Sequence, residues 1–372
     1  MTNRLWWMLG GGTVFSIGLV GLIVAAVTVR SRDESIEQPA RLLSSAQVQR
    51  VAGSMAGLSI DSKDIWQCVV MAPPGRASLI HAWRVVAFMD EWGGDGPSSP
   101  VAALWRRGLA ERFGVSLSAS VPQESGMVID WPSLEEAHSG QFLAAMAECG
   151  VPAQAIVRTS GGQWTIQQLL EARCSRRDVL AEPEFATVPF AMYHRRQASR
   201  FWGLRDYCGD VLESLSNSAV KSAAPCSGTH RLYSMAVLLN VNQSVPILDR
   251  EAENRGRLYL ERIGAQLKAL QHEDGAWRFD WADDRRFTAP KGASGDWGED
   301  IAITAHHLEW IAVNPFHTVS DTAVLKALEF INRSIRTAST ADIRKNYCGY
   351  THAIRALLLW HAQVRDENSG SE

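Results

Sequence analysis

The sequence predicts an all-α fold in which helices of an outer layer alternate with helices of an inner layer. Apolar residues recur with helical periodicity between polar loops that carry Gly or Pro, and the two-residue alternation typical of strands is scarce. Two short phrases also repeat: CSGTH, from Cys226 to His230, and CGYTH, from Cys348 to His352, each run directly into an apolar helical stretch. The repetition indicates that one helical unit recurs, with histidines that open the inward-facing helices.

Six pairs of helices are expected. The outer-layer helices are predicted, in chain order, over 41–56, 101–113, 165–173, 199–215, 251–271 and 321–336. The inner-layer helices are predicted over 78–92, 134–149, 184–194, 229–241, 301–313 and 350–363. Near the starts of inner helices lie His81, His138, His230, His306 and His352. The uneven spacing of these histidines makes the array a degenerate repeat.

The N-terminal segment predicts a membrane anchor. Residues 5–29 contain no charged side chain and are bracketed by Arg4 and Arg30. About 20 apolar residues span a bilayer, whereas a signal peptide has an apolar core of only about 7 to 15 residues, so an uncleaved anchor is the preferred interpretation. The short N-terminal tail and the acids Asp33 and Glu34 favour a single-pass protein of a bacterial cell membrane, with the bulk of the chain outside the cytoplasm.

The composition is that of a globular protein. With 46% hydrophobic residues, the chain can form a large hydrophobic core. Its net charge of −3 and the lack of a basic stripe disfavour nucleic-acid binding. Six cysteines are too few for a disulfide scaffold, although one or two bridges remain open. The expected organisation is an anchor over 1–30, a juxtamembrane spacer over 31–40, a helical domain over 41–366 and a disordered tail over 367–372.

One stretch resembles a known repeat. From Tyr259 to Trp277 a helix ends in Gln271, a short acidic turn carries Asp274 and Gly275, and Trp277 closes the turn. The phrase resembles the QW repeat of terpenoid cyclases and protein prenyltransferases. Gly275 supplies the turn, and Trp277 is expected to stack on the Gln271 amide and fill the gap between outer helices. The resemblance implies an (α/α)6-type toroid, two concentric helical layers around a central cavity, preceded by the transmembrane helix.

The catalytic signatures of these enzymes are absent. The cyclase DxDD acid is missing, and the nearest acids have a different spacing. The prenyltransferase zinc set begins with Asp-x-Cys, where this chain has Asn346, Tyr347 and Cys348. The resemblance, which covers about 229–363, therefore implies architecture and not activity.

The repeated Cys and His residues predict a zinc site made by Cys226, His230, Cys348 and His352. Residues four apart share one helix face, and two thiolates with two imidazoles suit tetrahedral zinc. The intervening helix over 301–313 would let the two pairs meet only near the axis of the ring. Two alternatives stay open: the residues are packed and hydrogen-bonded without a metal, or the Cys226 thiol is a nucleophile with His230 as its base.

Acids before an inner helix form a second candidate site. Glu299, Asp300 and His306 are placed to act as a carbohydrate hydrolase or lyase centre, for which the 14 tryptophans would supply sugar-stacking surface. The alternative is that these acids complement the positive end of the helix.

The sequence thus predicts a domain that binds an unknown ligand or partner in its central cavity. The competing prediction is an enzyme, either carbohydrate-active or dependent on zinc or a thiol. An enzyme should leave polar groups convergent and exposed with perturbed pKa values, whereas a binding scaffold should leave them satisfied by neighbours.

Overall fold

The computed structural model describes part of the chain between Ala46 and Asn368. The described residues are 46–52, 54–55, 58, 80–82, 84–85, 117–118, 128–130, 140–159, 161–174, 183–193, 204–217, 220, 225–282 and 297–368. The chain divides into two units, 1–37 and 38–372, and every described residue belongs to the second. No described helix is long and apolar enough to cross a membrane. Outside the described residues lie the predicted anchor over 5–29, the spacer over 31–40, the helix over 101–113, His138 and the last four residues of the predicted tail.

Helices account for most of the described residues, which confirms the predicted all-α class. Where outer helices are predicted, the structure has α2 (Ala46–Ala52), α7 (Ile166–Cys174), α9 (Leu204–Asn217), α11 (Arg250–Leu270) and α13 (Asp321–Thr337). Where inner helices are predicted, it has α6 (Gln141–Glu148), α8 (Pro183–Tyr193), α10 (Thr229–Ser244), α12 (Trp297–Val313) and α15 (Tyr347–Asn368). Residues 80–82 and 84–85 are also helical, and two short elements, η4 (Pro225–Gly228) and α14 (Thr340–Lys345), precede α10 and α15.

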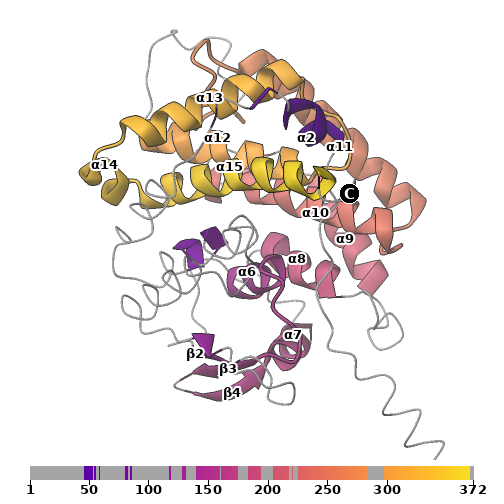
Figure 1. The fold of residues 1–372 in the computed structure, drawn as a ribbon. Helices are drawn as coiled ribbons and strands as arrows, with labels where there is room; N and C mark the ends of the chain where they lie inside the picture. Colours follow the sequence, from indigo (N-terminus) through magenta and orange to yellow (C-terminus); the bar gives the residue numbers. More distant parts are fainter. Residues whose placement is uncertain are drawn as a thin grey trace, which may run out of the picture. The chain divides into compact units, whose positions relative to one another are not determined.

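Helices pack in two interleaved series. The inner helices contact one another in chain order, α6 with α8, α8 with α10, α10 with α12 and α12 with α15 (Figure 1). The outer helices pack beside them, α9 on α8, α11 on α10 and α13 on α12. The first described helix, α2, contacts α13 and α15, which belong to the last pair. Segments from the two ends of the described domain therefore lie together.

Burial separates the two series. From Leu232 to Val241 every side chain of α10 is buried, and so is nearly every side chain of α12, whereas α11 and α13 bury only one face. A helix that is covered on all sides belongs to the interior, and a helix with one apolar face borders solvent. The outer helices also carry side-chain caps, from Asp249 on α11 and from Ser320 on α13. Their boundaries therefore follow closely from the sequence.

The turn after α11 has the geometry that its sequence requires. Gly275 has a φ of 96°, and a Cβ at this position would collide with the carbonyl of Lys326 on α13. The Gln271 amide donates to the carbonyls of Gly275 (3.0 Å) and Ala323 (2.7 Å), so it ties the turn to α13. Trp277 is fully buried, donates its indole N–H to the Leu267 carbonyl at 2.9 Å and contacts α12. This turn therefore connects α11, α12 and α13.

A small sheet was not predicted. Its strands are β1 (Leu117–Ser118), β2 (Val128–Asp130), β3 (Ile156–Thr159) and β4 (Gly162–Thr165). The β1–β2 and β3–β4 pairs are antiparallel, and β2–β3 is parallel. Residues 162 and 163 begin β4 and pair with β3. Strands of two to four residues are too short to show a two-residue alternation.

Candidate metal centre

Four histidine rings from four segments of the chain lie in contact. The ring centroids of His81 and His352 are 4.8 Å apart, those of His352 and His306 are 3.7 Å apart, and those of His306 and His230 are 5.0 Å apart. These rings come from the helical residues near 81 and from α15, α12 and α10. The recurring histidines of the sequence therefore converge. One expectation fails, because α12 begins at Trp297 and His306 consequently lies in its middle and not at its start.

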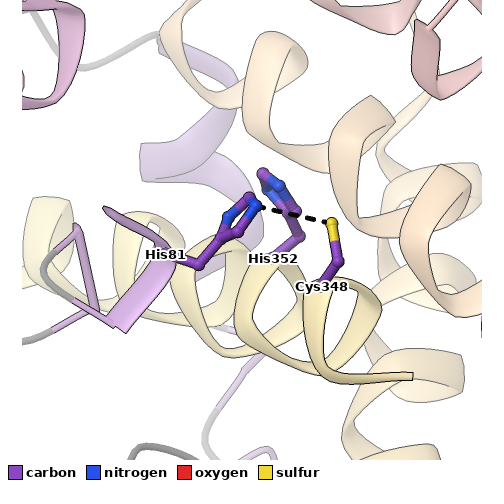
Figure 2. Close-up of side chains that lie close together, drawn as sticks. All are labelled: His81, Cys348 and His352. Atoms are coloured by element: carbon purple, nitrogen blue, oxygen red, sulfur yellow. Dashed lines mark hydrogen bonds between the residues drawn. The ribbon is translucent and has the colours of Figure 1, made fainter. Parts of the chain in front are cut away.

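One three-residue set of possible metal ligands lies at the His81 end of this row. The ligand atoms of His81, Cys348 and His352 all lie within 4.8 Å of one another. Figure 2 shows the three side chains converging, with Cys348 and His352 one turn apart on α15. The Cys348 Sγ and the His81 Nε2 are in hydrogen-bond contact at 3.6 Å, the dashed line in Figure 2. Both imidazoles are buried, whereas the Cys348 side chain is exposed.

A second set lies at the other end of the row. The ligand atoms of Cys226, His230 and His306 are also within 4.8 Å of one another. Each set thus consists of one cysteine and two histidines. The sets meet where His306 contacts His352.

The backbone that presents Cys226 is strained. Cys226, Ser227 and Gly228 have φ angles of 47°, 52° and 74°, so three successive residues are left-handed, and two of them are not glycine. Such a residue costs about 1–3 kcal/mol and persists only where its surroundings hold it. Here the Ser227 hydroxyl donates to the Phe279 carbonyl and the Thr229 hydroxyl donates to the Cys226 carbonyl, both at 2.7 Å.

A buried glutamate on α12 orients the two central histidines. Glu309 is 2% exposed, and its two oxygens lie 2.8 Å from Nδ1 of His352 and 3.2 Å from Nδ1 of His306. Burial alone would raise the pKa of Glu309. The charge of Arg355 and the contacts with His352 and His306 outweigh burial and hold that pKa well below its usual range. The carboxylate is therefore ionised and acts only as an acceptor.

The contacts with Glu309 place a proton on Nδ1 of each central histidine. Burial lowers the pKa of His352 to about 3 and outweighs the opposing charge of Glu309. The neutral ring must carry its proton on Nδ1 to donate to Glu309, and the same contact assigns Nδ1–H to His306. Within the described part of the chain, Nε2 of His306 and Nε2 of His352 are buried and have no hydrogen-bond partner. Such atoms call for an explanation, and a metal ion is one that suits a bare imidazole lone pair.

Behind Glu309 lies a buried network of ion pairs. Arg355 contacts Glu309 at 2.8 Å and Glu148 at 3.1 Å, and it also donates to the Tyr233 hydroxyl at 2.9 Å. Glu148 pairs in turn with Arg84 at 2.8 Å. Two carboxylates thus balance two guanidinium groups, which is the condition under which buried charges are tolerated. Five segments that belong to the inner series contribute to this network.

The structure distributes the predicted zinc ligands between the two sets. Cys348 and His352 form one set with His81, and the pair of Cys226 and His230 forms the other with His306. The sequence indicated both Cys–His pairs as ligands, but it did not assign His81 or His306 to them. It also missed the polar residue that follows each histidine by three positions and faces the same way, namely Arg84, Tyr233, Glu309 and Arg355.

The three residues of the predicted carbohydrate-active site, Glu299, Asp300 and His306, do not form one cluster. Glu299 is exposed, whereas Asp300 is fully buried and paired with Arg278, which also pairs with Asp274 at 2.8 Å. Burial raises the pKa of Asp300, although Arg278 opposes this. His306 instead contacts Glu309 and the other histidines. The contacts of Asp300 fit the alternative of a structural acid in the first turn of its helix.

Comparison with protein-family models, with curated proteins and with solved structures finds no match for this chain. The function of the centre is therefore inferred from its own residues.

Proposed function

We propose that this chain is an (α/α)6-type toroid domain that binds a transition-metal ion, zinc by preference, through His81, Cys348 and His352. Two buried imidazoles and one thiol supply borderline and soft ligands, which favour zinc over magnesium or calcium. The order of helix contacts supports the toroid, because the inner helices follow one another and α2 packs on the last pair. The ties from Gln271 to its own turn and to α13 support the proposed kinship with QW repeats.

One distance carries the metal proposal. Zinc lies about 2.3 Å from sulfur and about 2.0–2.1 Å from nitrogen, so tetrahedral geometry separates the two ligand atoms by about 3.6 Å. The Cys348 Sγ and the His81 Nε2 are 3.6 Å apart. The Nδ1–H of His352, held by Glu309, leaves its Nε2 as the third donor. A carboxylate behind a ligating histidine is the usual outer partner of a metal site.

Metal binding would release a proton from the thiol. Desolvation of the sulfur by the surrounding protein, followed by the charge of Glu309, raises the pKa of the Cys348 thiol to about 12, although the residue as a whole is exposed. The free thiol is consequently protonated at neutral pH, and an ion must displace that proton to form a thiolate bond. The Cys348 thiol is therefore a poor nucleophile without metal.

Three protein ligands leave a fourth position for water or a bound molecule, the arrangement of catalytic zinc sites. Among the described residues, the buried network beside the site balances two acids against two arginines. A zinc ion with one thiolate then adds a formal charge of about +1, so the open position would favour an anion. We therefore propose that the central cavity binds an anion, which would occupy the fourth position on the metal.

With the predicted anchor over residues 5–29, we propose that the helical domain lies outside the cytoplasm, on the cell membrane.

The test is the metal content and metal affinity of the purified full-length chain. Wild-type protein should retain zinc through chelator-free purification. Cys348→Ser and His81→Ala should each weaken zinc binding by more than about 100-fold, the upper end of effects of outer-shell changes. Matched controls are Cys208→Ala, which removes a thiol buried in α9, and His272→Ala, which removes an exposed histidine. Unchanged zinc affinity in folded Cys348→Ser and His81→Ala proteins would overturn the proposal.

A further inference from the structure

The set at the other end of the histidine row has the same ligand chemistry as the first. Cys226 lies four residues before His230, in the left-handed turn that precedes α10, whereas Cys348 and His352 lie one turn apart on α15. His306 completes the first of these pairs as His81 completes the other. The two sets share no residue. Their inner members, His306 and His352, are in ring contact and bind the two oxygens of one carboxylate, Glu309.

Two further observations point to a ligand at this second set. Nε2 of His306, on the ring edge opposite Nδ1, is buried in a side chain that is 3% exposed, and no described residue hydrogen-bonds to it. The three left-handed residues from Cys226 to Gly228 form the turn that leads into the helix of His230, and hydrogen bonds from the Ser227 and Thr229 hydroxyls fix that turn. Strain that is fixed in this way is typical of functional sites.

We propose that Cys226, His230 and His306 hold a second transition-metal ion beside the first, so that the chain carries a two-metal centre organised by Glu309. The second set rests on its own contacts, whereas the pairing of the two ions rests on the proposed function. Glu309 is the outer-shell partner of one histidine in each set. It therefore fixes the lone pairs of both inner ligands at once.

The charge of a two-metal centre defines the kind of molecule that it would take. Each ion with its thiolate carries a formal charge of about +1, and the balanced network of Arg84, Arg355, Glu148 and Glu309 does not offset it. Ions in paired sites lie about 3.5–4 Å apart and bind both oxygens of one group. The ligand class is thus an oxyanion, a phosphate or a carboxylate, that bridges the two ions.

Cobalt titration of the full-length apoprotein tests the second site. Thiolate-to-cobalt charge-transfer absorption reports each cysteine, and equilibrium dialysis counts the ions. Wild-type protein should bind about two ions, Cys226→Ser and Cys348→Ser about one each, and the double variant none. Cys208→Ala should retain both. His230→Gln is a second probe of the Cys226 set, with folding checked by circular dichroism.

The outcomes separate the two proposals. If wild-type protein binds one ion, Cys348→Ser abolishes it and both Cys226→Ser and His230→Gln leave it unchanged, the second site is wrong and the first stands. If only Cys226→Ser and His230→Gln lower cobalt binding, the proposed metal site at His81, Cys348 and His352 is wrong. If neither set of variants changes binding, both fail. Electron paramagnetic resonance tests the pairing: adjacent cobalt ions couple, so the wild-type signal should be smaller than the sum of the single-site variants. A signal equal to that sum would overturn the pairing.

Discussion

Glu309→Gln is the most informative single substitution, because Glu309 contacts one histidine from each ligand set. The carboxylate accepts from Nδ1 of His306 and Nδ1 of His352. A glutamine has the same shape but only one acceptor oxygen, and its amide nitrogen donates. One of the two histidines must then offer Nδ1 as an acceptor and carry its proton on Nε2. That proton occupies the lone pair that a metal would bind.

Two magnitudes follow from the structure. Loss of an outer-shell partner weakens metal binding by about 10–100-fold. The substitution also removes the carboxylate that pairs with Arg355 at 2.8 Å, one of the two acids of the buried network among the described residues. Breaking a buried ion pair costs about 3–5 kcal/mol, so the metal-free protein should lose unfolding free energy of that order.

The assay is zinc competition with a chromophoric chelator, together with urea unfolding in the presence of a metal chelator. Glu329→Gln, on the exposed face of α13, is the matched control and should leave both quantities unchanged. If the Glu309→Gln protein folds and binds zinc as wild type does, the idea that Glu309 sets the tautomers of these histidines is wrong.

Two further predictions concern the fold. Gly275→Ala should lower the free energy of unfolding by more than about 1 kcal/mol, because a Cβ there meets the Lys326 carbonyl; Gly150→Ala, also at positive φ but with nothing within 4 Å, should cost less, and equal losses in thermal unfolding would contradict this. Partial burial would raise the pKa of Asp321, but Arg50 at 3.1 Å holds that pKa below its usual range. The exposed pair should therefore contribute about 0.2–1 kcal/mol above the unfolded pKa of about 3.9 and lose it as the pH falls through the folded value. The stability gap between wild type and Asp321→Asn should close at acidic pH, and a gap independent of pH would refute the assignment.

The sequence was most informative where one helix face is buried. The helices predicted over 251–271 and 321–336 are observed as Arg250–Leu270 and Asp321–Thr337. Both have strong one-sided apolar patterns and capping residues at their starts, so local signals alone define them. The sheet strands lack such a signal, because two to four residues become strands only through pairing with distant segments.

The candidate site could be predicted only in part. The i, i+4 spacing correctly placed Cys348 and His352 on one helix, whereas Cys226 lies in a left-handed turn before the helix of His230. The histidine that joins each pair comes from another helix, and helix order and rotation decide that contact. Glu309 sits in the phrase HHLEW among apolar residues, and a single sequence does not distinguish a buried acid there from a solvated one. The hydrogen bonds to His306 and His352 reveal its role.

X-ray absorption at the zinc edge of the purified full-length chain tests the central claim most directly. The account predicts a first shell with about one sulfur at about 2.3 Å and about two imidazole nitrogens at about 2.0–2.1 Å per zinc, completed by a light atom. The sulfur contribution should fall in the Cys348→Ser protein. A shell of oxygen and nitrogen alone, or one unchanged by that substitution, would contradict a metal centre at His81, Cys348 and His352.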